Sequence, residues 1–478
     1  MSHEFYENPL GRRYASQAMR RLFSDDTKFR TWRRLWIALA ETERELGLPI
    51  PAEALEEMRR HVEDIDYEAV RVREEAVRHD VMAHIQAYAE QCPAAHGVIH
   101  LGATSAYVGD NADLLILRAG LDLLRGRVLS TIAALASFAE RYAGLPTLAY
   151  THFQPAQPTT VGKRATLWLQ DLTLDLDRLD FTRARLPLLG CKGATGTAAS
   201  FLELFEGDHD QVKRLEAGIA ARMGVDEILP VSGQTYPRKL DDFVLSVLSG
   251  LAQSAAKFSN DIRLLSHLRE AEEPFEVGQI GSSAMAYKRN PMRSERIASL
   301  ARFVITAAQN TALTAAAQWF ERTLDDSANR RLVLSETFLA TEAILLLYAN
   351  IAGGLVVNPA VIARHLHAET PFLATEAILM RAVKAGGDRQ VLHEIIRRHS
   401  LAAAARLKEG AEDNDLIDRL VGDGCFPLSR EELEAALAPE GLVGRAAQQT
   451  HEYLAYHIQP LLAANPPPSV GADGAIRV

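Results

Sequence analysis

Two long apolar series constrain the fold of this chain more than any other feature of its sequence. Over residues 114–142 and again over 240–268, an apolar residue recurs at every third or fourth position, which is the period of one face of an α-helix. Each series lasts roughly thirty residues, whereas a globular helix usually has about a dozen. Helices of that length bury one stripe against neighbouring helices, so the sequence predicts a helix bundle.

Shorter apolar series predict further helices over 165–179, 297–319 and 332–348. Strand-like alternation is scarce and aromatic residues make up only 7% of the chain, so we predict an all-α protein. A chain of 478 residues has room for about three domains. We place an N-terminal helical domain at 1–106, the long-helix bundle at 107–358, and a C-terminal helical domain at 359–478 with a flexible tail from about 463.

The charge balance and the cysteines argue against several classes of protein. The chain has 52 Lys and Arg against 62 Asp and Glu, a net charge of −10, which disfavours general binding of nucleic acid or an anionic membrane. Cys92, Cys191 and Cys425 form no CxxC pair, so we expect a reducing compartment and no structural zinc site. The N-terminus lacks a signal-peptide pattern, and the apolar stretch 343–357 is short for a membrane span. We therefore expect a soluble, cytoplasmic protein.

The common nucleotide-binding and hydrolytic motifs are absent. The sequence has no phosphate loop, no GxGxxG after a strand, no HExxH and no GxSxG. His365 and His367 are separated by one residue, a spacing more typical of a surface helix than of a metal site. If the protein binds a nucleotide or another anion, it must therefore do so through residues outside these motifs.

The most unusual segment is the loop at 278–296, which combines glycines, serines and cations. Ser282 and Ser283 follow two glycines, and Asn290 and Pro291 have the pattern of a helix N-cap and first turn. A helix N-terminus beside cations attracts a carboxylate or a phosphate, so the loop is a candidate anion site; a solvated basic loop is the alternative. The cations are Lys288, Arg289, Arg293 and Arg296.

Two breaks in the first third of the chain carry similar polar sets. The charged triplet at 78–80 fits an ordinary helix face as well as a binding site. The small-residue segment 100–105 precedes a helix that we expect Asp110 or Asn111 to cap. Its amides and hydroxyls suit either a carboxylate site or a simple turn.

Two later breaks complete this set. His152 lies on a proline-stiffened loop at 151–158, where a lone histidine is more often a hydrogen-bonding residue than a catalytic one. The segment 321–331 is either a salt-bridged connection between helices or an anion clamp. Several basic and hydroxyl-rich loops on an acidic protein favour a pocket for a polyanionic small molecule.

The loop at 281–291 also carries a family resemblance. Its sequence, Gly-Ser-Ser-Ala-Met-Ala-Tyr-Lys-Arg-Asn-Pro, resembles the signature GSSxMPxKxNP of the fumarase/aspartase superfamily, and the continuation to Arg296 resembles the adenylosuccinate lyase branch. One departure is Ala286, where the family has proline, which loosens the loop backbone. Stretches similar to animal-type members of that branch run in order along nearly the whole chain, at 29–36, 78–84, 99–105, 151–157, 200–208, 319–331 and 384–387.

The resemblance implies an assembly and a reaction. The assembly is a homotetramer whose central helices form one shared bundle and whose active sites draw on three subunits. The reaction is β-elimination of fumarate from adenylosuccinate, giving AMP, and from succinylaminoimidazole carboxamide ribotide. No metal and no organic cofactor is implied. We therefore expect small succinyl nucleotides and further copies of the chain as partners, and neither nucleic acid nor a membrane.

The resemblance also assigns roles residue by residue. Ser282 matches the base, His152 the acid, and Glu295 the carboxylate that orients the histidine, while Lys288 and His79 support the chemistry. Contacts to phosphate, ribose and base are implied for Arg13, Tyr14, Arg78, His79, Asp80, Arg322, Ser327 and Arg331. Contacts to the succinyl group and adjoining purine are implied for Thr104, Ser105, Gln234, Lys288, Asn290 and Arg296.

The chemistry of an elimination fits these residue types. It needs a base for a weakly acidic C–H and an acid for the leaving nitrogen, with cations or amides to hold the charged intermediate. One alternative is a superfamily lyase acting on argininosuccinate, but the basic clusters around Arg13, Arg78 and Arg331 suit a phosphate, which that substrate lacks. The other is a noncatalytic relative, which would have lost the acid or the base; Ser282 and His152 are both present.

Overall fold

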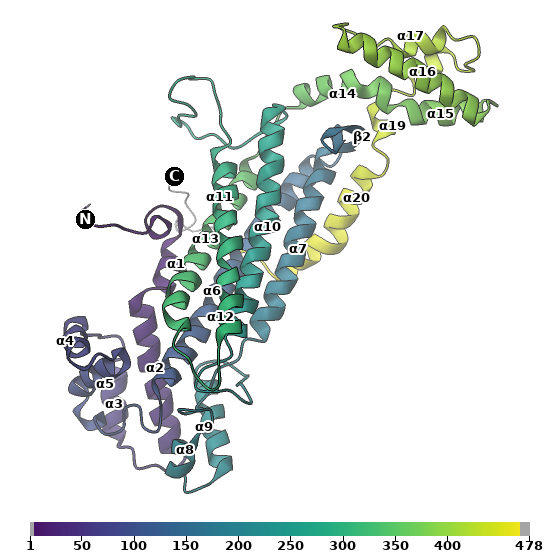
Figure 1. Cartoon of the computed structure of the whole chain (residues 1–478). Helices are drawn as coiled ribbons and strands as arrows, with labels where there is room; N and C mark the ends of the chain where they lie inside the picture. Colours follow the sequence, from purple (N-terminus) through teal and green to yellow (C-terminus); the bar gives the residue numbers. More distant parts are fainter. Residues whose placement is uncertain (1–3, 469–478) are drawn as a thin grey trace.

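The computed structural model describes residues 4–468 and shows an elongated, helical molecule (Figure 1). Its centre is a bundle of long helices, which confirms the predicted all-α fold. Helix α6 packs on α7 and α13, and α10 packs on α11, α7 and α13. The bundle helices are α6 (Ser105–Arg141), α7 (Val161–Ala184), α10 (Lys239–His267), α11 (Met292–Ala307), α12 (Gln309–Ala317) and α13 (Asp326–Gly354).

The apolar series of the sequence form the core of this bundle. On α6 the stripe includes Leu117, Leu121 and Val128, and on α10 it includes Val244 and Leu251, all at most 1% exposed. Burying each such side chain contributes about 1.5–3 kcal/mol. The helix predicted at 297–319 is interrupted at residue 308, where α11 ends and α12 begins.

Helix α6 begins earlier than predicted. Its N-cap is Thr104, so Asp110 and Asn111 lie inside the helix and are buried instead of capping it. Tertiary partners explain the difference. Asp110 accepts hydrogen bonds from Arg238, and the Asn111 side chain is bonded to the backbone of Gly190. The Asn111 amide also donates to the carbonyl of Tyr107, one turn earlier in the same helix, so both side chains are satisfied inside α6 and not at its N-terminus.

The N-terminal helices form a second core beside the lower end of the bundle. Trp32, Trp36 and Tyr88 pack there with Phe201 and Leu215, which come from the segment between α7 and α10. Residues outside 1–106 thus share this core, and the boundary at 106 stays a prediction. The helices of this region are η1 (Leu10–Tyr14) and α1 (Gln17–Leu22), whose Leu10 and Met19 belong to the bundle core, and α2 (Asp25–Glu45), α3 (Ala52–Arg60), α4 (Tyr67–Val77), α5 (Asp80–Gln91), η2 (Pro93–Ala95), α8 (Ala199–Leu204) and α9 (His209–Arg222).

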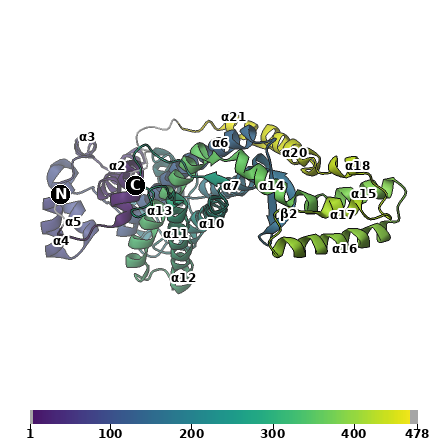
Figure 2. The same ribbon diagram turned by 90° about the horizontal axis from the view of Figure 1, so that it is seen from above.

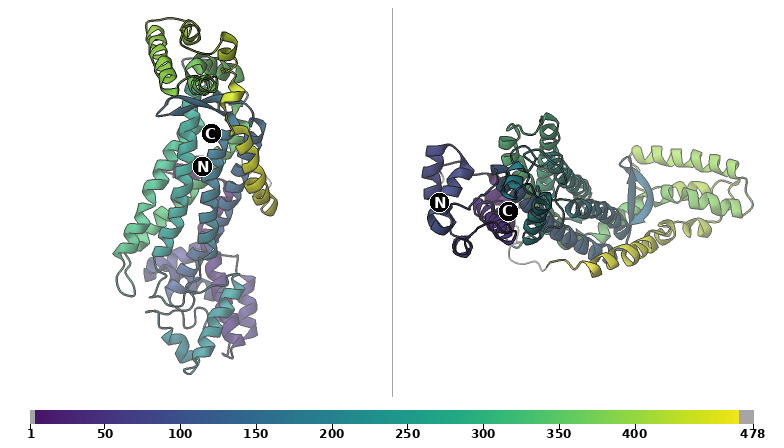
Figure 3. Two further views of the ribbon diagram at one scale, coloured as in Figure 1. Left: turned by 90° about the vertical axis from the view of Figure 1, so that its right-hand side faces the viewer. Right: turned by 90° about the horizontal axis from the view of Figure 1, so that it is seen from below.

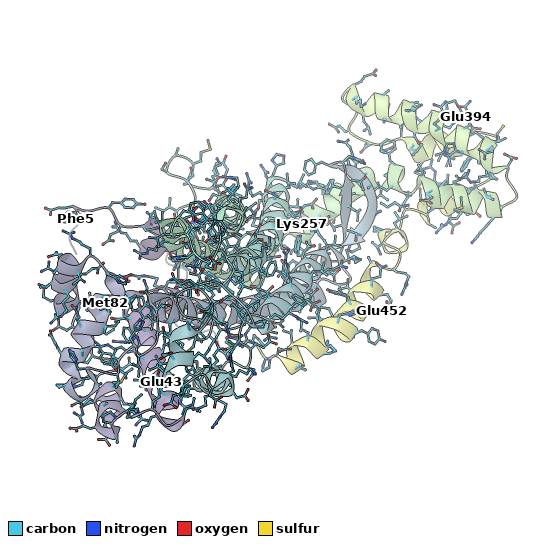
Figure 4. The ribbon with its side chains drawn as sticks, turned by 60° about the horizontal axis from the view of Figure 1, so that its bottom comes forward. Phe5, Glu43, Met82, Lys257, Glu394 and Glu452 are labelled. Carbon is cyan, nitrogen blue, oxygen red and sulfur yellow. The ribbon has the colours of Figure 1, made fainter. Side chains whose placement is uncertain are left out.

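A third core lies in the helices after α13, which extend away from the bundle (Figure 2). Met82 of α5 and Glu394 of α16 mark opposite ends of the molecule (Figure 4). Helix α20 then packs against α7 and α6, η3 packs against α6, and α21 packs against η3. This region comprises α14 (Pro359–Leu373), α15 (Thr375–Lys384), α16 (Arg389–Lys408), α17 (Leu416–Val421), α18 (Arg430–Glu434), α19 (Pro439–Leu442), α20 (Ala446–Tyr453), η3 (Leu454–Ile458) and α21 (Gln459–Ala464).

The tail predicted to be flexible from about 463 is described only in part. Arg125 of α6 donates a hydrogen bond to the side-chain oxygen of Asn465 at 2.8 Å. Residues 469–478 lie outside the described residues.

The segment at 150–160 is a β-hairpin, not the predicted proline-stiffened loop. Strands β1 (Pro146–Thr151) and β2 (Gln154–Thr160) pair antiparallel, and a second short pair joins β3 (Ala271–Glu272) to β4 (Val356–Val357). In a two-stranded ribbon each strand is an edge, where proline is tolerated. The hairpin crosses the end of the bundle beside the C-terminal helices (Figure 3).

Helix α13 is the one helix among residues 4–468 that is long and apolar enough to cross a membrane. It is longer than the apolar stretch 343–357 suggested. In its most apolar window, 67% of the residues are buried inside the molecule. That burial is typical of the core helix of a soluble protein.

Candidate active site

The first group of predicted site residues meets where α5, α6 and α13 begin. His79 caps α5, and its Nδ1 accepts the backbone N–H of Met82 at 3.3 Å. Its Nε2 therefore carries the proton in the neutral ring and donates to Ser105 Oγ, also at 3.3 Å. Asp80 forms a 3.5 Å ion pair with Arg331. The structure thus gathers residues that are far apart in sequence onto one surface.

Arg78 and Thr104 flank these contacts. Arg78 ends α4 with a φ of 57°, in the left-handed region. A non-glycine residue held there is uncommon and is often found at functional sites. Thr104 is the residue before the first turn of α6 and makes no side-chain cap bond.

A second group surrounds Arg322, at the start of α13. Arg322 donates to both carboxylate oxygens of Asp326 at 3.0 Å. The backbone N–H of Gln234 donates to the carbonyl of Glu321, and its side chain donates to the carbonyl of Ala194 at 3.1 Å. A cleft of 430 Å³ runs beside these residues, lined by Thr235, Lys239, Trp319, Phe320 and Arg322 among others. Ser327 lies in the first turn of α13, next to Asp326.

A buried ion network, which we call the arginine network, holds this second group. Arg238 is 1% exposed and donates to Asp326 at 2.6 Å and to both oxygens of Asp110 at 3.1 and 3.2 Å. Arg330 donates to Asp241 at 2.7 Å and to Asp113 at 2.9 Å. The network thus joins α6, α10, α13 and the segment before α10.

Charge pairing sets the protonation states of this network. Burial alone raises the pKa of Asp326, but Arg238 and Arg322 together bring it below its ordinary value. Burial also disfavours charge on Arg238, yet Asp110 and neighbouring acids hold its pKa above the ordinary value. The Arg238–Asp326 pair is therefore ionised, whereas at Asp110 burial outweighs the attraction of Arg238 and Arg330 and raises the pKa of the carboxyl.

The third group is the exposed loop at 273–291, which protrudes from the bundle before α11 (Figure 1). We call it the Ser282 loop. Ser282 Oγ accepts the backbone N–H groups of Ala284 at 3.3 Å and Met285 at 3.1 Å. Lys288 is exposed on the same loop, and its backbone N–H closes a turn with the carbonyl of Met285. Two amides therefore already point at the hydroxyl that the resemblance assigns as base.

Asn290 is not the N-cap of α11, which corrects the sequence prediction. Pro291 takes that position, and the Asn290 side chain instead donates to the carbonyl of Gly281 at 2.9 Å. The first amides of α11, those of Arg293 and Ser294, donate to the carboxylate of Glu273 at 3.0 and 2.5 Å. The partial positive charge at a helix N-terminus attracts the carboxylate of Glu273. Because Glu273 already occupies these amides, they are not free to bind a substrate anion.

The remaining predicted residues lie on three other elements. Tyr14 belongs to η1, and the Arg296 guanidinium lies 5.7 Å from the centre of its ring. Arg13 is exposed beside Tyr14. Glu295 is exposed in the first turn of α11.

His152 stands apart from every other predicted site residue. It is exposed and forms the turn of the hairpin with Phe153, with φ values of 52° and 57°, which is the backbone of a type I′ turn. The bonds of Ser282 Oγ are to Ala284 and Met285 of its own loop, not to the hairpin. Helix α6 separates it from Ser105, and 37 residues of helix span about 55 Å.

Sequence reasoning missed the residues that support these groups. Arg238, Asp326 and Glu273 make no recognisable motif, since their roles arise only from tertiary contacts. Glu342 offered a signal, because it is a charged residue within the apolar helix predicted at 332–348. It is fully buried, bonds the backbone and hydroxyl of Ser16, and so fixes the start of the chain that carries Arg13.

No group of three or more histidine, cysteine or acidic side chains in the described part of the chain is arranged to hold a metal ion. His365, one of the pair noted in the sequence, is bonded to Glu270.

Comparison with known proteins identifies the family. Residues 15–306 match the lyase family, and residues 371–453 match the adenylosuccinate lyase C-terminus family. The chain is 50% identical to adenylosuccinate lyase of Saccharomyces cerevisiae, over 95% of this chain and 94% of that protein. It is 49% identical to adenylosuccinate lyase of Schizosaccharomyces pombe, over 96% of each chain.

Solved structures agree with this fold. The 3-carboxy-cis,cis-muconate lactonizing enzyme of Pseudomonas putida superposes with a TM-score of 0.82 at 24% identity, covering 95% of this chain and 99% of that one. From the extent of the sequence matches, the chain belongs to the adenylosuccinate lyase family of the fumarase/aspartase superfamily.

Proposed function

We propose that this protein is an adenylosuccinate lyase that eliminates fumarate from adenylosuccinate, giving AMP, and from succinylaminoimidazole carboxamide ribotide. The observation that carries the proposal is the setting of Ser282, whose hydroxyl receives two backbone amides on a loop with the family's signature. Identity of 50% and 49% to relatives of that name, over nearly the whole of each chain, supports it. Purine nucleotide synthesis in the cytoplasm is the corresponding cellular role.

Ser282 acts as the base in this proposal. A serine hydroxyl is a poor base unless negative charge on its oxygen is stabilised, and the N–H groups of Ala284 and Met285 supply that stabilisation. Lys288, on the same loop, adds a positive charge near the substrate's carboxylates. His152 gives the leaving nitrogen its proton, as general acid, and Glu295 orients the imidazole.

The other residues bind the substrate. Arg13, Arg78 and Arg331 provide charge-assisted contacts to the phosphate, and Arg322 serves the same end of the substrate. The remaining contacts to ribose, base and succinyl group come from Tyr14, His79, Asp80, Thr104, Ser105, Gln234, Asn290, Arg296 and Ser327.

The active protein is a homotetramer with shared sites in this proposal. The hairpin with His152 follows the end of α6 whereas Ser105 begins that helix, and β2 and the Ser282 loop lie near one end of the bundle whereas α12, which precedes Arg322, lies toward the other (Figure 1). A site using all of them must combine several chains, and symmetric oligomers allow this. Apolar side chains exposed along the bundle, such as Leu313 and Leu332 at 70% and 64%, suit burial between subunits.

An activity assay tests the reaction. The purified protein should release fumarate and AMP from adenylosuccinate with no added metal, and EDTA should not inhibit it. Argininosuccinate, which lacks a phosphate, is the matched control substrate. A metal requirement, or turnover of argininosuccinate in place of adenylosuccinate, would reject the assignment.

Subunit mixing tests the shared site. His152→Ala and Ser282→Ala proteins should each be inactive, but dissociating and reassembling an equal mixture should restore activity. Random assembly gives an intact histidine beside an intact serine in roughly a quarter of the sites. If both residues of a site came from one chain, no mixed tetramer would hold an intact pair. Continued inactivity after verified exchange would reject shared sites and leave the reaction assignment standing.

A further inference from the structure

We propose that Glu270 is a positioning residue for the catalytic acid. With Tyr150 and His365, it fixes the hairpin that carries His152; the inference rests on the proposed role of His152. Glu270 lies just past the end of α10 and is 1% exposed. Its backbone is fixed as well, since its N–H donates to the carbonyl of Leu265 and its carbonyl accepts the N–H of Asn358. It is therefore a rigid point between the bundle and the C-terminal helices.

One carboxylate oxygen of Glu270 joins three elements. Oε1 lies 2.9 Å from Nδ1 of His365, on α14, and accepts the hydroxyl of Tyr150, on β1, at 3.4 Å. Burial, reinforced by Glu270, raises the pKa of Tyr150 to about 12, so the phenol keeps its proton as a donor. Tyr150 is two residues from His152, and its ring lies 5.6 Å from that of Phe153, the other turn residue.

The carboxylate of Glu270 has few partners. Its second oxygen, Oε2, is buried and has no hydrogen-bond partner among the described residues. Arg164 of α7 is the nearby cation; it donates to the carbonyl of Leu148 on β1, and attraction to Glu270 opposes the fall in its pKa on burial. A buried carboxylate that loses a donor is costly, so removing His365 should shift Glu270 and, through Tyr150, the hairpin.

The hairpin needs such an anchor. A two-stranded ribbon is marginally stable by itself, and this one ends in two non-glycine residues with positive φ, a conformation held only when the surroundings enforce it. Its second link is the side chain of Gln157, which donates to Glu376 of α15. The C-terminal helices therefore contribute Glu376 and, through Glu270, His365 to the positioning of the hairpin that carries His152.

The pair His365 and His367 provides a matched test. Both lie on α14, but His367 is exposed while His365 meets Glu270. His365→Leu removes the donor, His365→Asn restores an N–H near the position of Nδ1, and His367→Leu is the control. We expect His365→Leu to lower kcat about 10- to 100-fold with little change in KM, because a displaced acid slows chemistry without weakening substrate binding. His365→Asn should recover most of the loss, and His367→Leu should match wild type.

A readout independent of activity completes the test. Hydrogen–deuterium exchange of residues 146–160 should be faster in His365→Leu than in His367→Leu, with both proteins shown to be tetrameric by light scattering. Equal exchange and equal kcat in these two variants would overturn the anchor, as would a loss confined to KM. Inactivity of the wild-type protein on adenylosuccinate would count against the proposed function instead, and the exchange comparison would still decide whether His365 holds the hairpin.

Discussion

The arginine network and the Ser282 loop hold their site residues in opposite ways. In the network, Arg238 and Asp326 are at most 1% exposed and bonded on several sides. In the loop, residues 283–289 are all exposed, and the main ties lie at its base, from Glu273 to α11 and from Asn290 to Gly281. The binding residues near the network are therefore fixed before substrate arrives, whereas the loop retains freedom to move.

This difference matches the two tasks in the proposed reaction. Fixed partners let Arg322 meet a phosphate or base without loss of side-chain entropy on binding. A loop with few buried contacts opens at low cost, which suits a segment that must admit the substrate and then close over it. Substitutions in the network should thus change stability, and substitutions in the loop should change turnover.

The largest expected effect is on turnover. Ser282→Ala should lower kcat at least about 1,000-fold, because the hydroxyl acts mainly in the transition state. The free energy of unfolding should hardly change, since Ser282 bonds only within its own exposed loop. Fumarate release and urea unfolding measure the two quantities. Ser283→Ala, at the exposed neighbour, is the control, and near-normal turnover in Ser282→Ala would show that another group is the base.

The reverse pattern is expected in the network. Arg238→Met should lower the free energy of unfolding by about 3–5 kcal/mol, because it leaves the buried carboxylate of Asp110 without its bonded arginine and removes one of the two arginines that bond Asp326. Lys239→Met, at the exposed next residue, removes the same charge and should cost much less. Urea unfolding at a fixed protein concentration measures both variants. If Arg238→Met and Lys239→Met had equal free energies of unfolding, the network would contribute no more to stability than a surface ion pair.

Glu43 shows what a buried carboxylate does without a partner. It lies among the N-terminal helices (Figure 4), it is fully buried, and neither carboxylate oxygen has a hydrogen bond among the described residues. Burial raises its pKa from 4.5 to about 9. Between these values the unfolded chain loses the proton while the folded chain keeps it, so Glu43 lowers stability as pH rises.

Glu43→Gln should remove that dependence. Relative to wild type, the variant should gain about 2–3 kcal/mol in free energy of unfolding between pH 5 and pH 8. The full linkage slope of 1.36 kcal/mol per pH unit would give about 4 kcal/mol over the same range. Urea unfolding of both proteins at the two pH values measures the gain. A difference between them that does not vary with pH would show that Glu43 is ionised in the folded protein.

The sequence predicted the features of the fold and site that depend on a local pattern of residues. The apolar period located the long helices, because burying one face leaves the same spacing in any bundle. The signature located the Ser282 loop. Asp110 and Asn111 were misplaced as caps, since their real partners, Arg238 and Gly190, lie more than 70 residues away.

The residues that support the candidate site could not be predicted from the sequence, for the same reason. Glu273 neutralises the first turn of α11 and Glu270 meets His365 only after the chain folds. Neither contact has a fixed spacing in sequence. The hairpin was missed because its prolines, at 155 and 158, read as loop residues, whereas an edge strand accepts them.

The smallest expected effect is that of Ala286→Pro on the order of the Ser282 loop. The N–H of Lys288 closes a turn on the carbonyl of Met285, which places Ala286 at the second position of that turn. Proline suits this position because its fixed φ matches the turn. Ala286 has no positive φ, and no backbone or side-chain hydrogen bond of the described residues uses its N–H, so Ala286→Pro removes no contact.

Ala286→Pro should therefore favour the ordered loop by about 0.4–1 kcal/mol, chiefly by reducing the conformations open to the disordered loop. Slower cleavage of the loop by a protease, and slower amide exchange over 283–289, would report this gain. If closure of a mobile loop limits turnover, kcat should change by no more than the corresponding factor of about 2–5. Ala284→Pro is the matched control, since it removes the N–H that Ala284 donates to Ser282 and should slow turnover. Equal effects of the two prolines would show that the turn at Met285–Lys288 does not govern the loop.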